Sequence, residues 1–254
     1  MLLPILLAKI LFVAGTLAMP SAEIQSQNIN RISRREEFIR RQAASPFHSS
    51  NWAGAVISNQ TANFQGVTGQ FVVPTFTAVS GLRNAYISIW LAIDGLTCTT
   101  ATIKAGVDIE INDFGTVSYL VWDEYLPGQY LTESTTFTAQ VTRAGSLMNV
   151  GVLASVLGTP STIIENLTNG EGAADGRGFA PSPALCGADA IWAVEVWETG
   201  DVRVPVTVEW QNPQAQTGDV RIVSPGSENV VNTVENGVAL SSCSTTATSL
   251  TCSF

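Results

Sequence analysis

The feature that most limits the fold of this chain is a succession of short runs rich in β-branched and aromatic residues, which begins near residue 50. The runs cover residues 52–57, 67–76, 84–93, 101–111, 116–126, 135–141, 148–156, 190–198, 203–210 and 219–223. Gly and Pro separate them, and no window has the 3.6-residue period of an amphipathic helix. We therefore predict one all-β domain, a β-sandwich of two stacked antiparallel sheets.

The run at residues 101–111 shows the alternation of a strand most clearly. One face carries the apolar side chains Ile103, Ala105, Val107, Ile109 and Ile111. The other face carries Lys104, Asp108 and Glu110. The pattern predicts one core face and one face on which a lysine lies beside two carboxylates. A solvated face with a weak ion pair is the alternative, but Lys104 is the only lysine after the first 22 residues, which favours a specific role.

The first 45 residues differ in character from the rest. Residues 1–22 form a long apolar stretch that ends in small residues, which is typical of a secretory signal peptide. Residues 23–45 are charged, with arginine pairs at 34–35 and 40–41, and we predict a pro-segment that ends near residue 45. A membrane anchor and a disordered polar arm are the respective alternatives. The mature domain, residues 46–254, is then secreted and monomeric, with no membrane partner after signal cleavage.

Charge excludes one class of partner. Without residues 1–41 the chain keeps six basic and 18 acidic residues, a formal charge of about −12. Such a surface repels the phosphate backbone, so we predict no nucleic-acid partner. At low pH most of these carboxylates are protonated, which suits a protein that works in acid.

The cysteine count is even, as expected for a secreted chain with disulfides. Cys243 and Cys252 bracket a turn-like stretch that suits a local bridge, which leaves Cys98 to pair with Cys186; three pairings are possible in all. Two sequons place candidate glycans on Asn59 and Asn166.

The residues present exclude several kinds of catalytic site. The single histidine, His48, lies at the start of the mature region, so a Ser-His-Asp triad would have to use it and a zinc site would lack its usual ligands. The sequence contains no G-x-S-x-G, P-loop, G-x-G-x-x-G or H-E-x-x-H motif. We predict no metal and no cofactor, and carboxylates remain as the candidate acid and base.

Glu195 is the best-placed carboxylate. It lies in an apolar run and shares its face of the strand with Ile191, Ala193 and Trp197. A carboxylate in such surroundings needs a partner or holds its proton to unusually high pH, as catalytic carboxylates do. The alternative is a glutamate on an edge strand that reaches water. We assign the side chains of Trp192, Trp197 and Trp210 to packing.

Several motifs in one order resemble a known family. They are SNWAGAV at 50–56, IWLAIDGLTC at 89–98, TATIKAGVD at 100–108, VWDEYLP at 121–127, IENLTNG at 164–170, LCGADAIWAVEVWE at 185–198 and CSTTATSLTCSF at 243–254. Over residues 49–254 the chain resembles the glutamic peptidases, the fungal acid endopeptidases also called eqolisins. The resemblance implies a lectin-like jelly roll whose curved face binds protein or peptide substrates, and it implies the same two disulfides.

The resemblance also implies a mechanism. In that family a glutamate and a glutamine project from neighbouring strands; the glutamate takes a proton from the attacking water and passes it to the leaving amine. Glu195 matches this glutamate. Trp52 and Trp90 match tryptophans that line the cleft, and Asp94 matches an aspartate in the hydrogen-bond network of the site. We add Trp122 as a third aromatic residue of the cleft.

The family glutamine is not present. An alignment without gaps places Lys104 at its position. An ammonium group donates hydrogen bonds but cannot accept one, so Lys104 can stabilise an oxyanion but cannot accept a bond from the attacking water.

Three hypotheses follow. The first is an acid endopeptidase in which Glu195 is general base and acid and Lys104 has an altered oxyanion role. The second is a family member that has lost catalysis and binds peptide or protein. The third is a carbohydrate-binding or carbohydrate-active sandwich with Asp108 and Glu195 as its two carboxyl groups.

Overall fold

The protein is seen here in a computed structural model, which describes residues 48–49, 52–75, 85–127, 129–133, 143–154, 159–168, 179, 183–197 and 204–254. The signal peptide and pro-segment predicted for residues 1–45 lie outside the described residues, as does the strand predicted at 135–141. Within the described ranges, no helix combines the length and apolar character that a membrane span requires.

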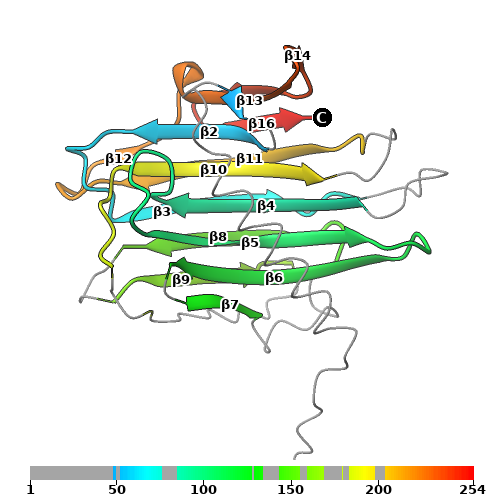
Figure 1. Ribbon diagram of the computed structural model, residues 1–254, viewed down its shortest axis with the longest axis horizontal. Coiled ribbons are helices and arrows are strands. Elements are labelled where there is room, and N and C mark those ends of the chain that lie inside the picture. Colours follow the sequence, from blue (N-terminus) through cyan, green and yellow to red (C-terminus); the bar gives the residue numbers. More distant parts are fainter. Residues whose placement is uncertain are drawn as a thin grey trace, which may run out of the picture. The chain divides into compact units, whose positions relative to one another are not determined.

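The larger sheet has nine strands among the described residues. They are β1 His48–Ser49, β2 Trp52–Ser58, β4 Ala85–Ile93, β5 Thr102–Ile111, β6 Val117–Leu126, β7 Gln129–Glu133, β10 Asp189–Trp197, β13 Val230–Glu235 and β14 Val238–Ala239. Their order is β1-β13-β2-β10-β4-β5-β6-β7, and β14 pairs with β13. Figure 1 shows the long strands β2, β10, β4, β5 and β6 side by side. The strand pairs of the larger sheet are antiparallel, except for β1 with β13, which is parallel.

The second sheet has seven strands in the described part of the chain. They are β3 Gly66–Val72, β8 Leu147–Leu153, β9 Ser161–Asn166, β11 Thr207–Gln216, β12 Ile222–Val223, β15 Ser242–Thr245 and β16 Ser249–Ser253. Their order is β15-β16-β11-β3-β8-β9, and β12 pairs with β11. A short 3₁₀ turn, η1 Ser227–Asn229, precedes β13. The predicted all-β sandwich is therefore confirmed.

Some strand limits differ from the sequence prediction. The run predicted at 203–210 becomes β11, which begins at Thr207 and continues past Pro213 to Gln216. Pro213 is tolerated because the register with β3 shifts between Gln211 and Gln214, and a bulge is a place where a missing N–H does little harm. Several strands were not predicted, among them β9 and β13, whose sequences, STIIEN and VVNTVE, are short and hold no aromatic residue.

The core lies between the two sheets. Strand β4 packs on β3 and β8, and β5 packs on β8 and β9, as the two layers of Figure 1 show. The apolar side chains that β5 was predicted to turn inward are buried, together with those of Trp192 and Trp210. Alternation along the strands fixes which residues reach this layer, since a slip of one residue would reverse every side chain.

The opposite, outer face of the larger sheet is also buried. A second apolar cluster covers it, which we call the tryptophan cluster: Trp52, Val56, Trp90, Ala92, Trp122, Ile191, Ala193 and Val231. Along β5 every residue but Glu110 is buried, so the alternative of a solvated face around Lys104 is wrong. The larger sheet therefore places charged groups among apolar ones on a face that is shielded from water.

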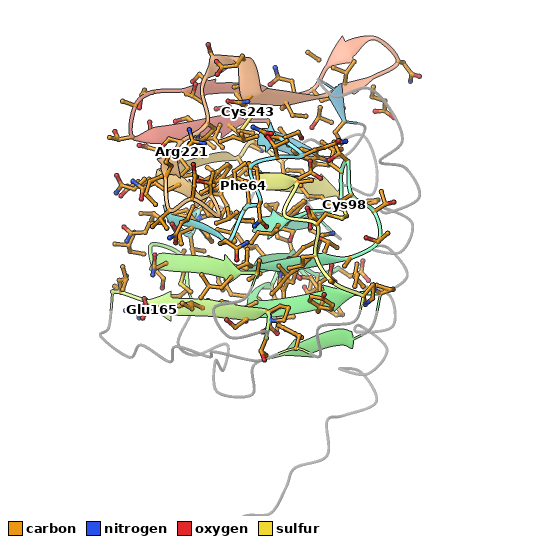
Figure 2. The ribbon with its side chains drawn as sticks, turned by 90° about the vertical axis from the view of Figure 1, so that its left-hand side faces the viewer. Phe64, Cys98, Glu165, Arg221 and Cys243 are labelled. Atoms are coloured by element: carbon orange, nitrogen blue, oxygen red, sulfur yellow. A yellow bond between two sulfur atoms is a disulfide. The ribbon has the colours of Figure 1, made fainter. Side chains whose placement is uncertain are left out.

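Both predicted disulfides are present. Cys98 is joined to Cys186, and Cys243 is joined to Cys252 directly opposite it in the β15–β16 pair. Figure 2 labels one cysteine of each bridge, and the two lie in separate parts of the fold. One bridge therefore secures a C-terminal hairpin, and the other joins the loops that follow β4 and precede β10.

The two sequons differ in access. Asn59 is exposed, and its side-chain oxygen accepts hydrogen bonds from the backbone and hydroxyl of Thr61. Asn166 is 1% exposed, and its amide nitrogen donates to Ser146 Oγ. The amide nitrogen of Asn166, to which a glycan would attach, is thus engaged in the fold whereas Asn59 is exposed, and both glycans stay predictions.

A row of small residues lets a large indole lie flat on the outer face. Trp90 on β4 has Ala193 of β10 on one side and Gly106 of β5 on the other. A Cβ atom at residue 106 would lie 2.4 Å from the carbonyl oxygen of Ile89 and 2.7 Å from Trp90 Cβ. Gly106 is thus required by the close approach of Trp90.

We expect Gly106→Ala to lower the free energy of unfolding by about 2 kcal/mol, because overpacking against backbone forces neighbouring atoms to move. Urea unfolding of the purified protein measures this. Gly151→Ala is the matched control, since its added Cβ would come no closer than 3.3 Å to another atom. Equal stability of the two variants would contradict the packing argument.

Candidate active site

Glu195 lies on the outer face near one end of β10, which is an inner strand of the larger sheet. Its side chain is 6% exposed, so the alternative of an edge strand that reaches water is wrong. In the register of the sheet, Trp52 of β2 and Ser88 of β4 lie directly opposite Glu195. Cross-strand neighbours of this kind are within contact distance. The carboxyl group therefore lies between an indole ring and a hydroxyl group, largely out of water.

The partner of the Glu195 carboxylate is a tryptophan of the same strand. Trp197 Nε1 donates a hydrogen bond to Glu195 Oε1 at 2.5 Å. The assignment of Trp197 to packing alone is therefore wrong. The signal in the sequence is the spacing of two residues, which places both side chains on one face of a strand.

Lys104 is buried and has a charged partner on the next strand. Its side chain is 6% exposed, and its Nζ lies 3.5 Å from Glu124 Oε1, on a side chain that is 5% exposed. The same ammonium lies 5.1 Å from the centre of a Trp90 ring, a cation–π distance. Glu124 lies opposite Lys104 in the β5–β6 register. Sequence reasoning missed Glu124 because only the strand pairing brings it to residue 104.

Lys104 and Glu195 share the outer face. The expectation that they come from neighbouring strands is wrong. Strand β4 lies between β5 and β10, and along it Lys104 is opposite Ala92 whereas Glu195 is opposite Ser88. Four residues along the strand and two strand spacings put their Cα atoms on the order of 16 Å apart in a flat sheet. A substrate group between them can be reached by both only if the two side chains lean toward each other.

The three predicted cleft tryptophans are together in the tryptophan cluster. Trp52, Trp90 and Trp122 are each 2% exposed. The rings of Trp52 and Trp90 have centroids 6.1 Å apart and planes inclined at 53°. In the full chain these indoles therefore form a shielded apolar surface and not an open rim, and of the three it is Trp90, on β4, that lies between the strands of Glu195 and Lys104.

A second carboxylate lies in the same row as Glu195. Ser88 Oγ donates a hydrogen bond to Asp108 Oδ1 at 2.6 Å, and both residues are 1% exposed. Ser88 is opposite Asp108 on one side and Glu195 on the other. The hydroxyl proton of Ser88 is directed to Asp108, and the Trp197 indole donates to Glu195. Sequence reasoning did not single out Ser88, because a serine in an apolar run has no signal of its own.

Asp94 lies at a different place from the one implied by the resemblance. It follows the end of β4, six residues along from Ser88, and is fully buried. Its carboxylate accepts hydrogen bonds from the backbone N–H groups of Cys186, Gly187, Ala188 and Asp189, at 2.7 to 3.2 Å. Burial raises the pKa of Asp94, and the four backbone donors oppose that rise. Asp94 is therefore part of the framework that holds the strand ends together.

In the described part of the chain, three side chains with potential metal-ligand atoms lie within 4.8 Å of one another: Asp94, Cys98 and Cys186. The two sulfur atoms are bonded to each other. The carboxylate oxygens already accept four backbone N–H groups. The two sulfur atoms and the carboxylate therefore do not suit a metal ion, which requires deprotonated thiolates and unoccupied carboxylate oxygens.

Comparison with known proteins decides the family. The family model described as the peptidase A4 family matches residues 50–254. The chain belongs to this family. Aspergillopepsin-2 of Aspergillus niger is 31% identical over 228 residues, which cover 82% of this chain and 78% of that protein. Scytalidopepsin B of Scytalidium lignicola is 27% identical over 264 residues, which cover 93% and 96%.

A solved structure supports the fold of this glutamic peptidase family member. Scytalido-glutamic peptidase with a transition-state analog inhibitor superposes with a TM-score of 0.66 and 24% identity, covering 81% of this chain and 98% of the other. The predicted membership and β-sandwich fold are thus confirmed, and the carbohydrate hypothesis receives no support from these comparisons.

We expect Asp94→Asn to destabilise this family member by about 2–4 kcal/mol, because an amide cannot accept the four N–H bonds and buried donors would be left unsatisfied. Since the pKa of folded Asp94 is raised, its titration contributes stability that is complete below the unfolded-state pKa near 3.8 and is lost as pH rises through the folded-state pKa. The deficit of the variant should therefore be larger at pH 3 than at pH 7.

Urea unfolding at these two pH values measures the deficit. Asp219→Asn is the control, because Asp219 is an exposed partner of Arg221 and its loss should change the free energy of unfolding little. A deficit for Asp94→Asn that grows with pH would show that the four backbone donors outweigh burial.

Proposed function

We propose that this protein is a secreted acid endopeptidase of the glutamic type, with Glu195 as general base and general acid. Family membership supports the reaction class, and the two disulfides together with the signal-like residues 1–22 support secretion. The observation that carries the assignment is the buried carboxylate of Glu195, held by an indole N–H on the face that also bears Lys104.

In the proposed reaction the Glu195 carboxylate removes a proton from a water molecule that attacks the peptide carbonyl carbon. The proton then passes from Glu195 to the nitrogen of the leaving amine as the C–N bond breaks. Water is consumed, and a carboxylic acid and an amine are formed. The low exposure of Glu195 suits both steps, because a shielded carboxyl group can exchange its proton over a range of pH that serves an acid and a base.

Lys104 is proposed to stabilise the oxyanion in place of the family glutamine. An ammonium is a stronger donor than an amide. The Glu124 carboxylate at 3.5 Å balances its charge without excluding further donation, since the group carries three N–H bonds. The extended peptide would lie over the tryptophan cluster between the two side chains, with Trp52, Trp90 and Trp122 in contact with its apolar groups.

A second function is favoured by one observation. The Lys104 ammonium has a charged partner in Glu124, and its strand is not a neighbour of the strand that carries Glu195. A site in which the cation stays with Glu124 throughout would bind peptide on the outer face without cleaving it. Asp108, the second carboxylate of the carbohydrate hypothesis, accepts a hydrogen bond from Ser88.

Proteolysis of an unfolded protein substrate between pH 2 and pH 7 tests the proposal. We expect the purified wild-type protein to cleave in acid and Glu195→Gln to lose at least a factor of about 10² to 10⁴ in kcat, the usual contribution of a general base. Lys104→Met, which removes the donor, should lose about 10² to 10³. Lys104→Gln restores the family residue and should stay within tenfold of wild type.

Other results would separate the alternatives. Binding of a peptide without cleavage, unchanged by Glu195→Gln, would favour the non-catalytic function. Activity that is present only in Lys104→Gln would show that the lysine disables the site. Equal cleavage by wild type and Glu195→Gln would remove Glu195 from the mechanism.

A further inference from the structure

A short hydrogen bond joins Trp197 to the candidate base. The distance from Trp197 Nε1 to Glu195 Oε1 is 2.5 Å. Both residues lie near one end of β10 on its outer face, with Ser88 opposite Glu195 and Tyr86 opposite Trp197. Glu195 is buried, whereas Trp197 is partly exposed. The strand itself fixes the relative position of the two side chains, because they are two residues apart on one pleated face.

The indole is a donor of a particular kind. It has one N–H group, carries no charge, does not titrate and cannot accept a hydrogen bond. A hydrogen bond to the charged form of a carboxyl group favours that form, whereas burial among apolar groups favours the neutral form. At Glu195 the indole N–H therefore opposes the effect of the surrounding tryptophan cluster at every pH.

We propose that Trp197 is a positioning residue of the active site, which orients the Glu195 carboxylate and keeps it ionised in acid. The proposal rests on the function proposed above for Glu195. Because Oε1 accepts the indole N–H, the proton exchanged in the reaction is carried by Oε2. The carboxylate is thereby presented in one orientation instead of rotating between equivalent ones.

Two other hydrogen-bond donors on this face, Lys104 and Ser88, lie close to other carboxylates, which supports this role. The Lys104 ammonium has Glu124 at 3.5 Å, and the Ser88 hydroxyl donates to Asp108 at 2.6 Å. The usual family pair is a glutamate with a glutamine amide, a neutral donor, and in this chain a neutral donor reaches the glutamate from Trp197 on its own strand.

The other titratable groups that face this position must be considered in any dependence on pH. On the outer face of the described strands β2, β10, β4, β5 and β6 they are Tyr86, Lys104, Asp108, Glu110, Glu124 and Asp189. Asp108 is in the same row as Glu195, two strands away. A replacement at Trp197 leaves all of these groups in place, so a change in titration can be assigned to the lost N–H bond.

Trp197→Phe tests the proposal, because it keeps an aromatic ring and removes only the donor. A hydrogen bond to a charged group corresponds to about one pH unit or more. We expect the acid limb of the kcat/KM profile to move up by about one pH unit, with kcat lower by about tenfold on that limb and KM within twofold. A role in packing alone would lower stability or overall activity without moving the limb.

A second measurement does not depend on activity. Carbon-13 NMR of the purified protein with labelled glutamate follows the Glu195 carboxyl directly, and the spectrum of Glu195→Gln assigns its signal. The midpoint of this titration should rise by about one unit in Trp197→Phe. Trp192→Phe is the matched control, since Trp192 is on the same strand but donates to the Thr68 carbonyl in the core, and it should leave the midpoint unchanged.

The two readouts separate the failure of this inference from that of the proposed function. An unchanged Glu195 midpoint in folded Trp197→Phe would overturn the inference, whatever the activity. A shifted midpoint in a protein whose cleavage does not depend on Glu195 would sustain the inference about Trp197 and reject the role of Glu195 as the base.

Discussion

The burial of charged groups on the outer face of the larger sheet is the constraint on which the rest of the structure depends. Each charge taken out of water needs a partner, and the sheet supplies one within the same face: Trp197 for Glu195, Glu124 for Lys104 and Ser88 for Asp108. The apolar floor of the tryptophan cluster makes these contacts strong, because hydrogen bonds and ion pairs gain strength where water is excluded. The same shielding is what gives a carboxyl group access to acid–base chemistry.

The register between β4 and β10 places Glu195, and two carboxylates at one end of this strand pair stabilise that register. Asp94, after β4, accepts N–H groups from the loop before β10, and Asp189, at the start of β10, accepts N–H groups of Leu96 and Thr97 after β4. The Cys98–Cys186 disulfide joins the same two loops. The loop after β4 and the loop before β10 are thus fixed to each other. This keeps β4 and β10 in register, with Ser88 opposite Glu195.

The lysine at position 104 changes the electrostatics of the face and not its architecture. An amide there would leave Glu124 without its lysine partner, so the ion pair and the lysine belong together as one feature of this chain. Trp197 is a neutral donor to Glu195. The outer face of this chain thus holds an acid with an indole and an amine with a second acid.

The sequence by itself determined the all-β class and the inward and outward faces of β5, because alternation and residue type are local properties of a strand. It favoured the two disulfide pairings that are present and singled out Glu195 as a carboxylate among apolar residues. Only the tertiary structure decided that β4 separates Lys104 from Glu195, that Glu124 pairs with Lys104, and that Asp94 belongs to the framework at the strand ends. Those outcomes depend on strand order and register, which long-range packing selects from many arrangements with the same local pattern.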